Sequence, residues 1–97
     1  MKQELIEKLS KGETIKYREK GNSMLPLIKS GELLTAIPTT VADLEVGDIC
    51  FCRVKGSTLT HLVTAKDTQG RVQISNNKGH VNGWTKTVFG KIVKVEP

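Results

Sequence analysis

The segment Ile49–Ala65, ICFCRVKGSTLTHLVTA, decides the fold expected for this chain. Its two halves, residues 49–54 and 59–65, are rich in β-branched and apolar residues and flank Lys55-Gly56-Ser57, a pattern that predicts a β-hairpin. Four further runs rich in β-branched and apolar residues predict strands at residues 14–18, 33–37, 71–75 and 87–95. The sequence therefore predicts a mainly β fold.

The N-terminal segment differs from the rest because its apolar residues, Leu5, Ile6 and Leu9, have helical spacing. A glycine at position 12 is placed to end that helix. No repeat or linker is visible, and 97 residues suffice for one core. We expect a single domain, 1–97, with the helix in 1–12 and the β core in 13–97.

The stretch Asn76–Gly83, NNKGHVNG, is rich in asparagine and glycine. Such composition is typical of a loop, and the pair Asn82-Gly83 is typical of a turn. We therefore predict irregular structure between the last two strands.

Composition limits the possible partners. The net charge is +5, from 15 basic and 10 acidic residues, and the basic residues are scattered, so nucleic-acid binding is not expected. The charged N-terminus lacks the apolar stretch of a secretory signal, and no run is long enough to span a membrane. We expect a soluble, cytoplasmic protein without membrane insertion; its oligomeric state stays open.

Cys50 and Cys52 lie two positions apart on a predicted strand. They would share one face with Cα atoms roughly 6.5 Å apart and parallel Cβ vectors, which suits a disulfide poorly. A zinc site that adds His61 and His80 matches no common ligand spacing. We expect two free thiols in the core of a protein from a reducing compartment, and no metal or cofactor.

Ser23 is a candidate nucleophile within Gly21–Pro26, GNSMLP. The Gly-Asn pair permits a tight turn, Met24 can anchor it by packing inward, and Pro26 stiffens the end of the segment. A serine hydroxyl is a weak nucleophile unless a base takes its proton. On this turn alone, an ordinary turn serine is the alternative interpretation.

His61, in the middle of the second hairpin strand, is the candidate base, because imidazole accepts a proton near neutral pH. A core or surface histidine is the alternative. His80 lies in the predicted loop, where it could bind substrate, act as a rival base or simply face solvent. Asp48, after Gly47, is expected to make turn hydrogen bonds rather than to act as an acid catalyst.

In their order along the chain, these pieces resemble the superfamily of type I signal peptidases and self-cleaving SOS and phage repressors, the LexA-like serine peptidases. The resemblance covers roughly residues 13–95 and rests on five motifs: Gly-x-Ser-Met-x-Pro (21–26), Gly31-Glu32, Leu44-x-x-Gly47-Asp48-Ile49, His61 and Gly90-Lys91-Ile92-Val93. It implies that Ser23 is the nucleophile. His61 stands where the endoplasmic-reticulum and sporulation enzymes have a histidine base. Backbone N–H groups, including that of Ser23, and the Asn22 side chain would hold the oxyanion.

The chain also departs from that superfamily. Leu62 replaces the arginine that usually follows the base, and Glu32 replaces an aspartate. The region expected to supply a third, acidic residue reads Asn76–His80 and has no carboxylate, so the resemblance implies a Ser–His dyad.

Two functions are compatible with these features. The first is a soluble serine peptidase that cleaves an extended peptide, with Met24, Pro26 and His80 near the substrate. The alternative is a catalytically inactive phage or prophage protein that uses the same scaffold to bind a host protein or peptide. Self-cleavage of the repressor kind is not expected, because the sequence lacks the Ala-Gly and Cys-Gly dipeptides cut in those proteins.

Overall fold

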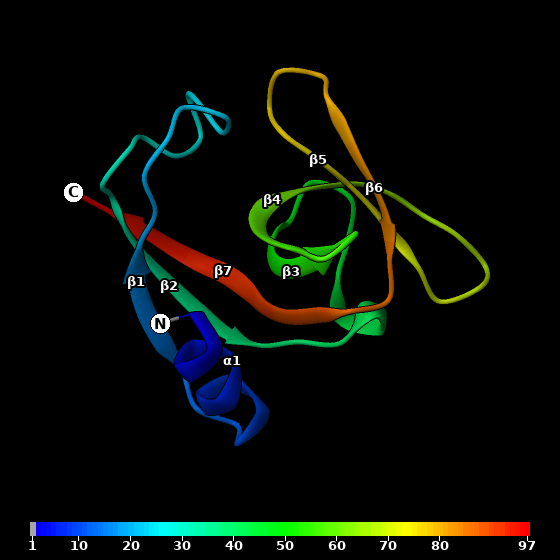
Figure 1. The fold of residues 1–97 in the computed structure, drawn as a ribbon, viewed down its shortest axis with the longest axis horizontal. Helices are drawn as coiled ribbons and strands as arrows, with labels where there is room; N and C mark the ends of the chain where they lie inside the picture. The colour runs from blue at the N-terminus through cyan, green and yellow to red at the C-terminus, as the bar shows by residue number, and fades with distance from the viewer. Residues whose placement is uncertain (1) are drawn as a thin grey trace.

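Seven strands form one antiparallel sheet in the computed structural model, which describes residues 2–97 (Figure 1). Its order is β1-β2-β7-β3-β4-β5-β6. The strands are β1 (Ile15–Arg18), β2 (Leu33–Pro38), β3 (Ile49–Val54), β4 (Ser57–Lys66), β5 (Val72–Ser75), β6 (Val81–Thr85) and β7 (Val88–Glu96). A helix, α1 (Lys2–Ser10), precedes them, and a short 3-10 helix (Val41–Asp43) follows β2. The mainly β fold with one short N-terminal helix is confirmed; Met1, part of the expected segment 1–12, lies outside the described residues.

The sheet curls around the β3–β4 hairpin, which lies at the centre of the molecule (Figure 1). Where the chain passes from β6 to β7 it returns to β3. There the Arg53 N–H donates to the Thr87 carbonyl over 3.0 Å, and the Thr85 hydroxyl donates to the Arg53 carbonyl over 2.6 Å. These bonds join the end of the sheet to its middle. The largest core cluster consists of Leu44, Cys50, Cys52, Val54, Val63, Val72 and Ile74.

The helix α1 packs on the face of the sheet opposite to this largest cluster. Its Leu9 is buried against Ile15, Ala36 and Phe51. The approach is close. A Cβ atom added at Gly90 of β7 would lie 3.1 Å from Leu9 Cδ1. Leu5 and Ile6, both partly buried, pack against the same cluster. One apolar stripe thus fixes the helix, and its remaining residues are exposed.

Cys50 and Cys52 are both buried in β3 and both free, as the sequence predicted. They belong to the same core cluster, as alternate residues of one strand face do. Hydrogen bonding to Cys52, followed by burial, raises the pKa of the Cys50 thiol well above its ordinary value. The thiol therefore stays neutral and serves as core packing.

The prediction of irregular structure over Asn76–Gly83 holds for residues 76–80 and is wrong for the last three, because strand β6 begins at Val81. β6 is an edge strand, where asparagine and glycine are tolerated more readily than in a sheet centre. Gly83 has a φ of +141°, and a Cβ there would lie 3.2 Å from Val54 Cγ1. Glycine is required at this position for a close approach of strands, so Asn82-Gly83 is not a turn.

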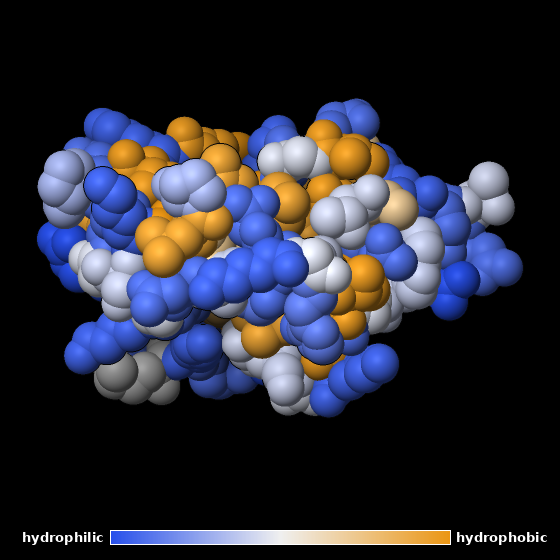
Figure 2. Space-filling view, turned by 90° about the horizontal axis from the view of Figure 1, so that it is seen from above, coloured by the Kyte–Doolittle hydropathy of each residue, from blue (hydrophilic) through white to orange (hydrophobic). Residues whose placement is uncertain are grey.

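The molecular surface seen from above carries apolar side chains in separate patches among hydrophilic ones (Figure 2). Small, separate groups of exposed apolar side chains are normal on the surface of a folded protein. Over residues 2–97, the helices fall short of the length and apolarity that crossing a membrane requires.

Candidate active site

Ser23 lies in the irregular segment between β1 and β2. Met24 and Ile28 of this segment are buried against Leu34, so the residue after the serine anchors the turn, as the sequence predicted. The ends of the segment are also tied together, since the Gly31 N–H donates to the Glu19 carbonyl over 2.7 Å. The serine therefore sits on a fixed turn.

The turn between β5 and β6 holds the serine segment from the opposite side. The Asn77 backbone N–H donates to the Ser23 carbonyl, and its side-chain Nδ2 donates to the Leu25 carbonyl, both over 2.8 Å. In Figure 1 the β5–β6 turn lies beside the loop that follows β1. Asn77 thus fixes the backbone on both sides of Met24.

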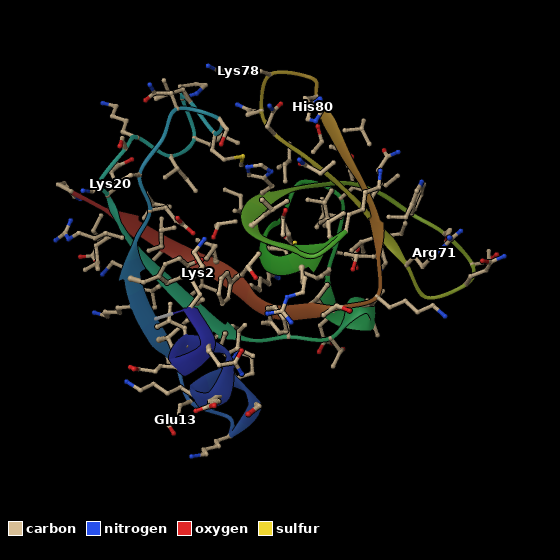
Figure 3. The ribbon with its side chains drawn as sticks, in the orientation of Figure 1. Lys2, Glu13, Lys20, Arg71, Lys78 and His80 are labelled. Atoms are coloured by element: carbon tan, nitrogen blue, oxygen red, sulfur yellow. The ribbon has the colours of Figure 1, made fainter. Side chains whose placement is uncertain are left out.

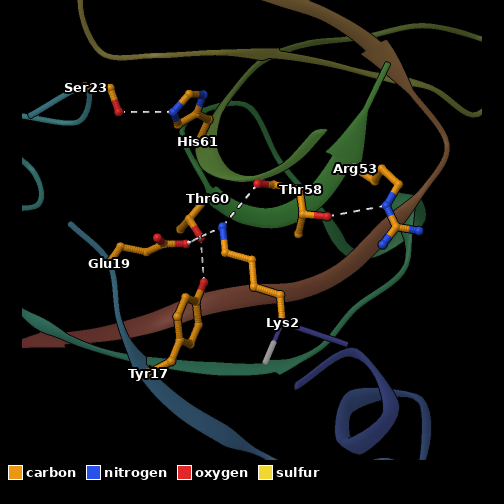
Figure 4. A network of polar contacts seen from close by, with 8 residues as sticks. All are labelled: Lys2, Tyr17, Glu19, Ser23, Arg53, Thr58, Thr60 and His61. Carbon is orange, nitrogen blue, oxygen red and sulfur yellow. Dashed lines mark hydrogen bonds and ion pairs between the residues drawn. The ribbon is translucent and has the colours of Figure 1, made fainter. Parts of the chain in front are cut away.

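Ser23 Oγ lies 3.1 Å from Nε2 of His61, within hydrogen-bonding distance (Figure 4). His61 stands in β4, where it pairs in register with Cys50 of the central strand β3. The imidazole is therefore carried by the hairpin at the centre of the sheet. The two side chains are separated by 38 positions in the sequence.

The other ring nitrogen of His61, Nδ1, lies 2.7 Å from Oδ1 of Asn82 in β6. The β5–β6 pairing explains this contact. Ile74 pairs with Gly83 and Ser75 with Val81, so Asn82 is an extra residue in the ladder. A β-bulge of this kind re-aims a side chain, and here the amide faces the imidazole.

The three side chains form a continuous hydrogen-bond chain, Ser23–His61–Asn82. Because an amide oxygen can only accept, Nδ1 must carry the ring proton, which leaves Nε2 as an acceptor for the serine hydroxyl. The Ser23 N–H has no acceptor of its own within residues 2–97, so it can donate to a developing oxyanion. This arrangement can activate a hydroxyl.

A pocket of about 170 Å³ opens beside the hydroxyl and the imidazole. It lies between the two residues that follow β1, the serine turn, the first residue of α1 and the first half of β4. Its lining consists of Lys2, Glu19, Lys20, Gly21, Ser23, Met24, Ile28, Thr58, Leu59, Thr60 and His61. A substrate bound there would lie against both Ser23 and His61.

The other predicted site residues differ in whether they line this pocket. Met24 lines the pocket, while Asn22 and Pro26 are exposed on the turn and are not part of the lining. His80 is exposed at the β5–β6 turn (Figure 3), and its backbone, not its ring, is bonded to Asn76 and Ser75. The geometry thus brings together Ser23, His61 and Met24, and leaves His80 outside.

Asp48 makes the turn contacts expected of it. Its Oδ2 accepts the Glu45 N–H over 2.8 Å and lies 3.4 Å from Lys91 Nζ. Asn82, in contrast, is not among the residues predicted from the sequence, because the third residue was expected within Asn76–His80. Val81, Trp84 and Thr85 are of residue types enriched in strands, but the Asn82-Gly83 pair between them favours a turn, so the sequence signal for this strand is weak.

No model of a known protein family matches this chain, and no curated protein matches it.

Proposed function

We propose that this protein is a serine peptidase in which Ser23 is the nucleophile, His61 the general base and Asn82 the residue that orients His61. The observation that carries the proposal is the Ser23–His61–Asn82 chain, with distances of 3.1 and 2.7 Å, at the wall of a pocket. A serine, a base and a residue that holds the base are the parts that nucleophilic catalysis needs.

In the first half of the reaction, Ser23 Oγ attacks the carbonyl carbon of the peptide bond, and its proton moves to His61 Nε2. The carbonyl oxygen becomes an oxyanion, for which the Ser23 N–H is an available donor. Collapse of this intermediate breaks the C–N bond. His61 returns its proton to the departing amine, and an ester on Ser23 remains.

In the second half, His61 takes a proton from water, and the resulting hydroxide attacks the ester carbonyl. The acid product leaves, and Ser23 regains its proton from His61. Throughout, the Asn82 oxygen accepts the Nδ1–H, so the imidazole keeps one orientation.

The order of motifs along the chain supports the same proposal. The Gly-x-Ser-Met turn and the histidine in the following hairpin are the parts that resemble the histidine-type signal peptidases, and we propose a relationship to them. Asn82 would stand in place of the acidic residue of those enzymes. A neutral amide orients an imidazole but stabilises its protonated form less than a carboxylate does.

The substrate we propose is an extended peptide, because the pocket lies along residues 58–61 of β4, a stretch that precedes the β4–β5 pairing, which begins at Leu62. Peptidase activity is tested by incubating the protein with a mixture of synthetic peptides and identifying new termini by mass spectrometry. Ser23→Ala, prepared in parallel, is the matched control. We expect cleavage by the parent protein and none by the variant.

Equal product formation by the parent and by Ser23→Ala would overturn the proposal, because the activity would then come from elsewhere. Peptide binding without cleavage in either protein would also overturn it. That second result would favour the alternative, a scaffold that binds peptides without chemistry.

A further inference from the structure

Next to the candidate active site, one hydroxyl group bonds a carboxylate and is itself bonded by a second hydroxyl group. The Thr60 hydroxyl donates to Glu19 Oε1 over 3.0 Å, and the Tyr17 hydroxyl lies 2.7 Å from the same Thr60 oxygen (Figure 4). Thr60 is buried, and burial raises the pKa of the Tyr17 phenol, so that phenol stays protonated and donates. The chain Tyr17–Thr60–Glu19 therefore fixes the carboxylate before any ligand arrives.

A cation of the protein itself occupies this position. Lys2 Nζ lies 3.6 Å from Glu19 Oε1 and donates to the Thr58 carbonyl over 3.3 Å. The carboxylate and the carbonyl thus form a cation site, which we name the Glu19 subsite. It opens into the same pocket as Ser23 and His61.

The lysine is held much less firmly than the carboxylate. The Lys2 side chain is 47% exposed and that of Glu19 25%. Exposed ion pairs contribute about 0–1 kcal/mol. Lys2 is also the first residue of α1, where the positive end of the helix dipole disfavours a cation. An incoming cation can therefore displace Lys2 at little cost.

We propose that the Glu19 subsite determines specificity and takes a lysine or arginine side chain of the peptide substrate in place of Lys2. The inference rests on the proposed function, since it names the substrate class of the same site. The fixed carboxylate is the recognition element, and Lys2 competes with the substrate for it. An anionic ligand bound to Lys2 and Lys20 is the opposite case, and it is an outcome of the test.

The test measures binding to full-length Ser23→Ala protein, so that it needs no turnover. The probes are fluorescein-labelled extended peptides that carry one lysine at successive positions, each paired with a peptide that has methionine there. A third set carries glutamate at the same positions. Dissociation constants come from fluorescence anisotropy. We expect about tenfold tighter binding of the lysine peptide at one position, and weakening of this preference with salt.

Two further substitutions, made in the Ser23→Ala protein, test whether Glu19 and Lys2 cause this preference. Glu19→Gln keeps the shape of the side chain and should abolish the preference for lysine over methionine. Lys2→Met removes the competitor and should tighten binding of the lysine peptide several-fold. Glu13→Gln, which raises the net charge by one as Glu19→Gln does but lies beyond the C-terminal end of α1 (Figure 3), should change neither value.

The inference is overturned if lysine and methionine peptides bind equally, if the preference survives Glu19→Gln, or if the glutamate peptide binds most tightly. These outcomes differ from failure of the proposed function. Cleavage without a Glu19-dependent preference would leave the peptidase and remove the subsite. Glu19-dependent binding without cleavage by the parent would leave the subsite and remove the peptidase.

Discussion

Asn82 orients the His61 ring toward Ser23, because its amide oxygen fixes the ring proton of His61 on Nδ1. Without it, the imidazole could rotate or adopt the other tautomer, and Nε2 would no longer face the hydroxyl as an acceptor. Its place in a bulge of an edge strand explains why only the structure shows it.

Replacing Asn82 tests this orienting role. We expect Asn82→Ala to lower kcat by about 10- to 100-fold with little change in KM. Loss of the group that hydrogen-bonds the second ring nitrogen of a metal-bound histidine has an effect of that size. Asn82→Asp keeps the acceptor oxygen and should restore most of kcat. If both variants lose kcat and stability equally, Asn82 supports only the fold.

Replacing His61 tests the base itself. General base catalysis contributes about 10²- to 10⁴-fold, so His61→Gln should lower kcat by at least 100-fold. His80→Gln is the matched control, because His80 is exposed and lies outside the pocket lining. A loss on His80→Gln comparable to that on His61→Gln would show that the wrong histidine has been assigned.

Stability should depend on pH through Tyr17 and Cys50. Burial raises the pKa of Tyr17, and hydrogen bonding with Cys52 followed by burial raises that of Cys50, so folding favours the neutral form of both groups. Their ordinary values are about 10 and 8.5. The stabilisation is therefore complete below about pH 8.5. It is lost above about pH 8.5 for Cys50 and above about pH 10 for Tyr17, in each case by up to about 1.4 kcal/mol per pH unit.

Urea unfolding at pH 7, 9 and 10.5 measures this loss. The Tyr17→Phe variant cannot ionise there, so its free energy of unfolding should fall less steeply above pH 10 than that of the parent. The same free energy of unfolding at pH 7, 9 and 10.5 would contradict the assigned burial of both groups.

Among the elements, the central strands follow directly from the sequence, and β6 does not. The β-branched and apolar residues of 49–54 and 59–65 predict β3 and β4, and both strands contribute to the core. β6 contains Asn82 and Gly83, whose local preference is for turns, and long-range contacts with β5 and Val54 override it. The candidate nucleophile and base were therefore identifiable, and the orienting residue was not.

Gly83 is the residue on which β6 depends. We expect Gly83→Val to lower stability by about 1–3 kcal/mol, because a side chain there requires an unfavourable φ and meets Val54. It should also lower kcat by moving Asn82. Thermal unfolding and peptide turnover measure the two effects. Unchanged kcat in a destabilised protein would show that β6 does not position Asn82.

The helix α1 depends on Leu9 in a similar way. Leu9→Ala should lower the free energy of unfolding by about 2–5 kcal/mol, because it leaves a cavity over Phe51 and Gly90. Lys8→Ala, on the exposed face, should cost little. Equal effects of the two substitutions, measured by urea unfolding, would mean that α1 is not docked on the sheet.

At the scale of the whole molecule, the candidate site is built from parts of the chain that meet only when the sheet is complete. Ser23 comes from the loop after β1, His61 from β4 and Asn82 from the edge strand β6. Asn77, in the turn before β6, bonds that turn to the serine loop. Spacing alone could place the first two on a turn and a strand. Their distance of 3.1 Å results from the curling of the sheet, which no local pattern encodes.

The measurement that tests the central claim most directly is covalent labelling of the serine by a fluorophosphonate, followed by intact-mass and peptide analysis. A serine activated by His61 should take up one adduct, at Ser23, and Ser23→Ala should take up none. Labelling of His61→Gln should be at least 100-fold slower than that of the parent, about the size of a general-base contribution. An unlabelled parent protein, or an adduct whose rate is the same in His61→Gln, would contradict the activation of Ser23 by His61.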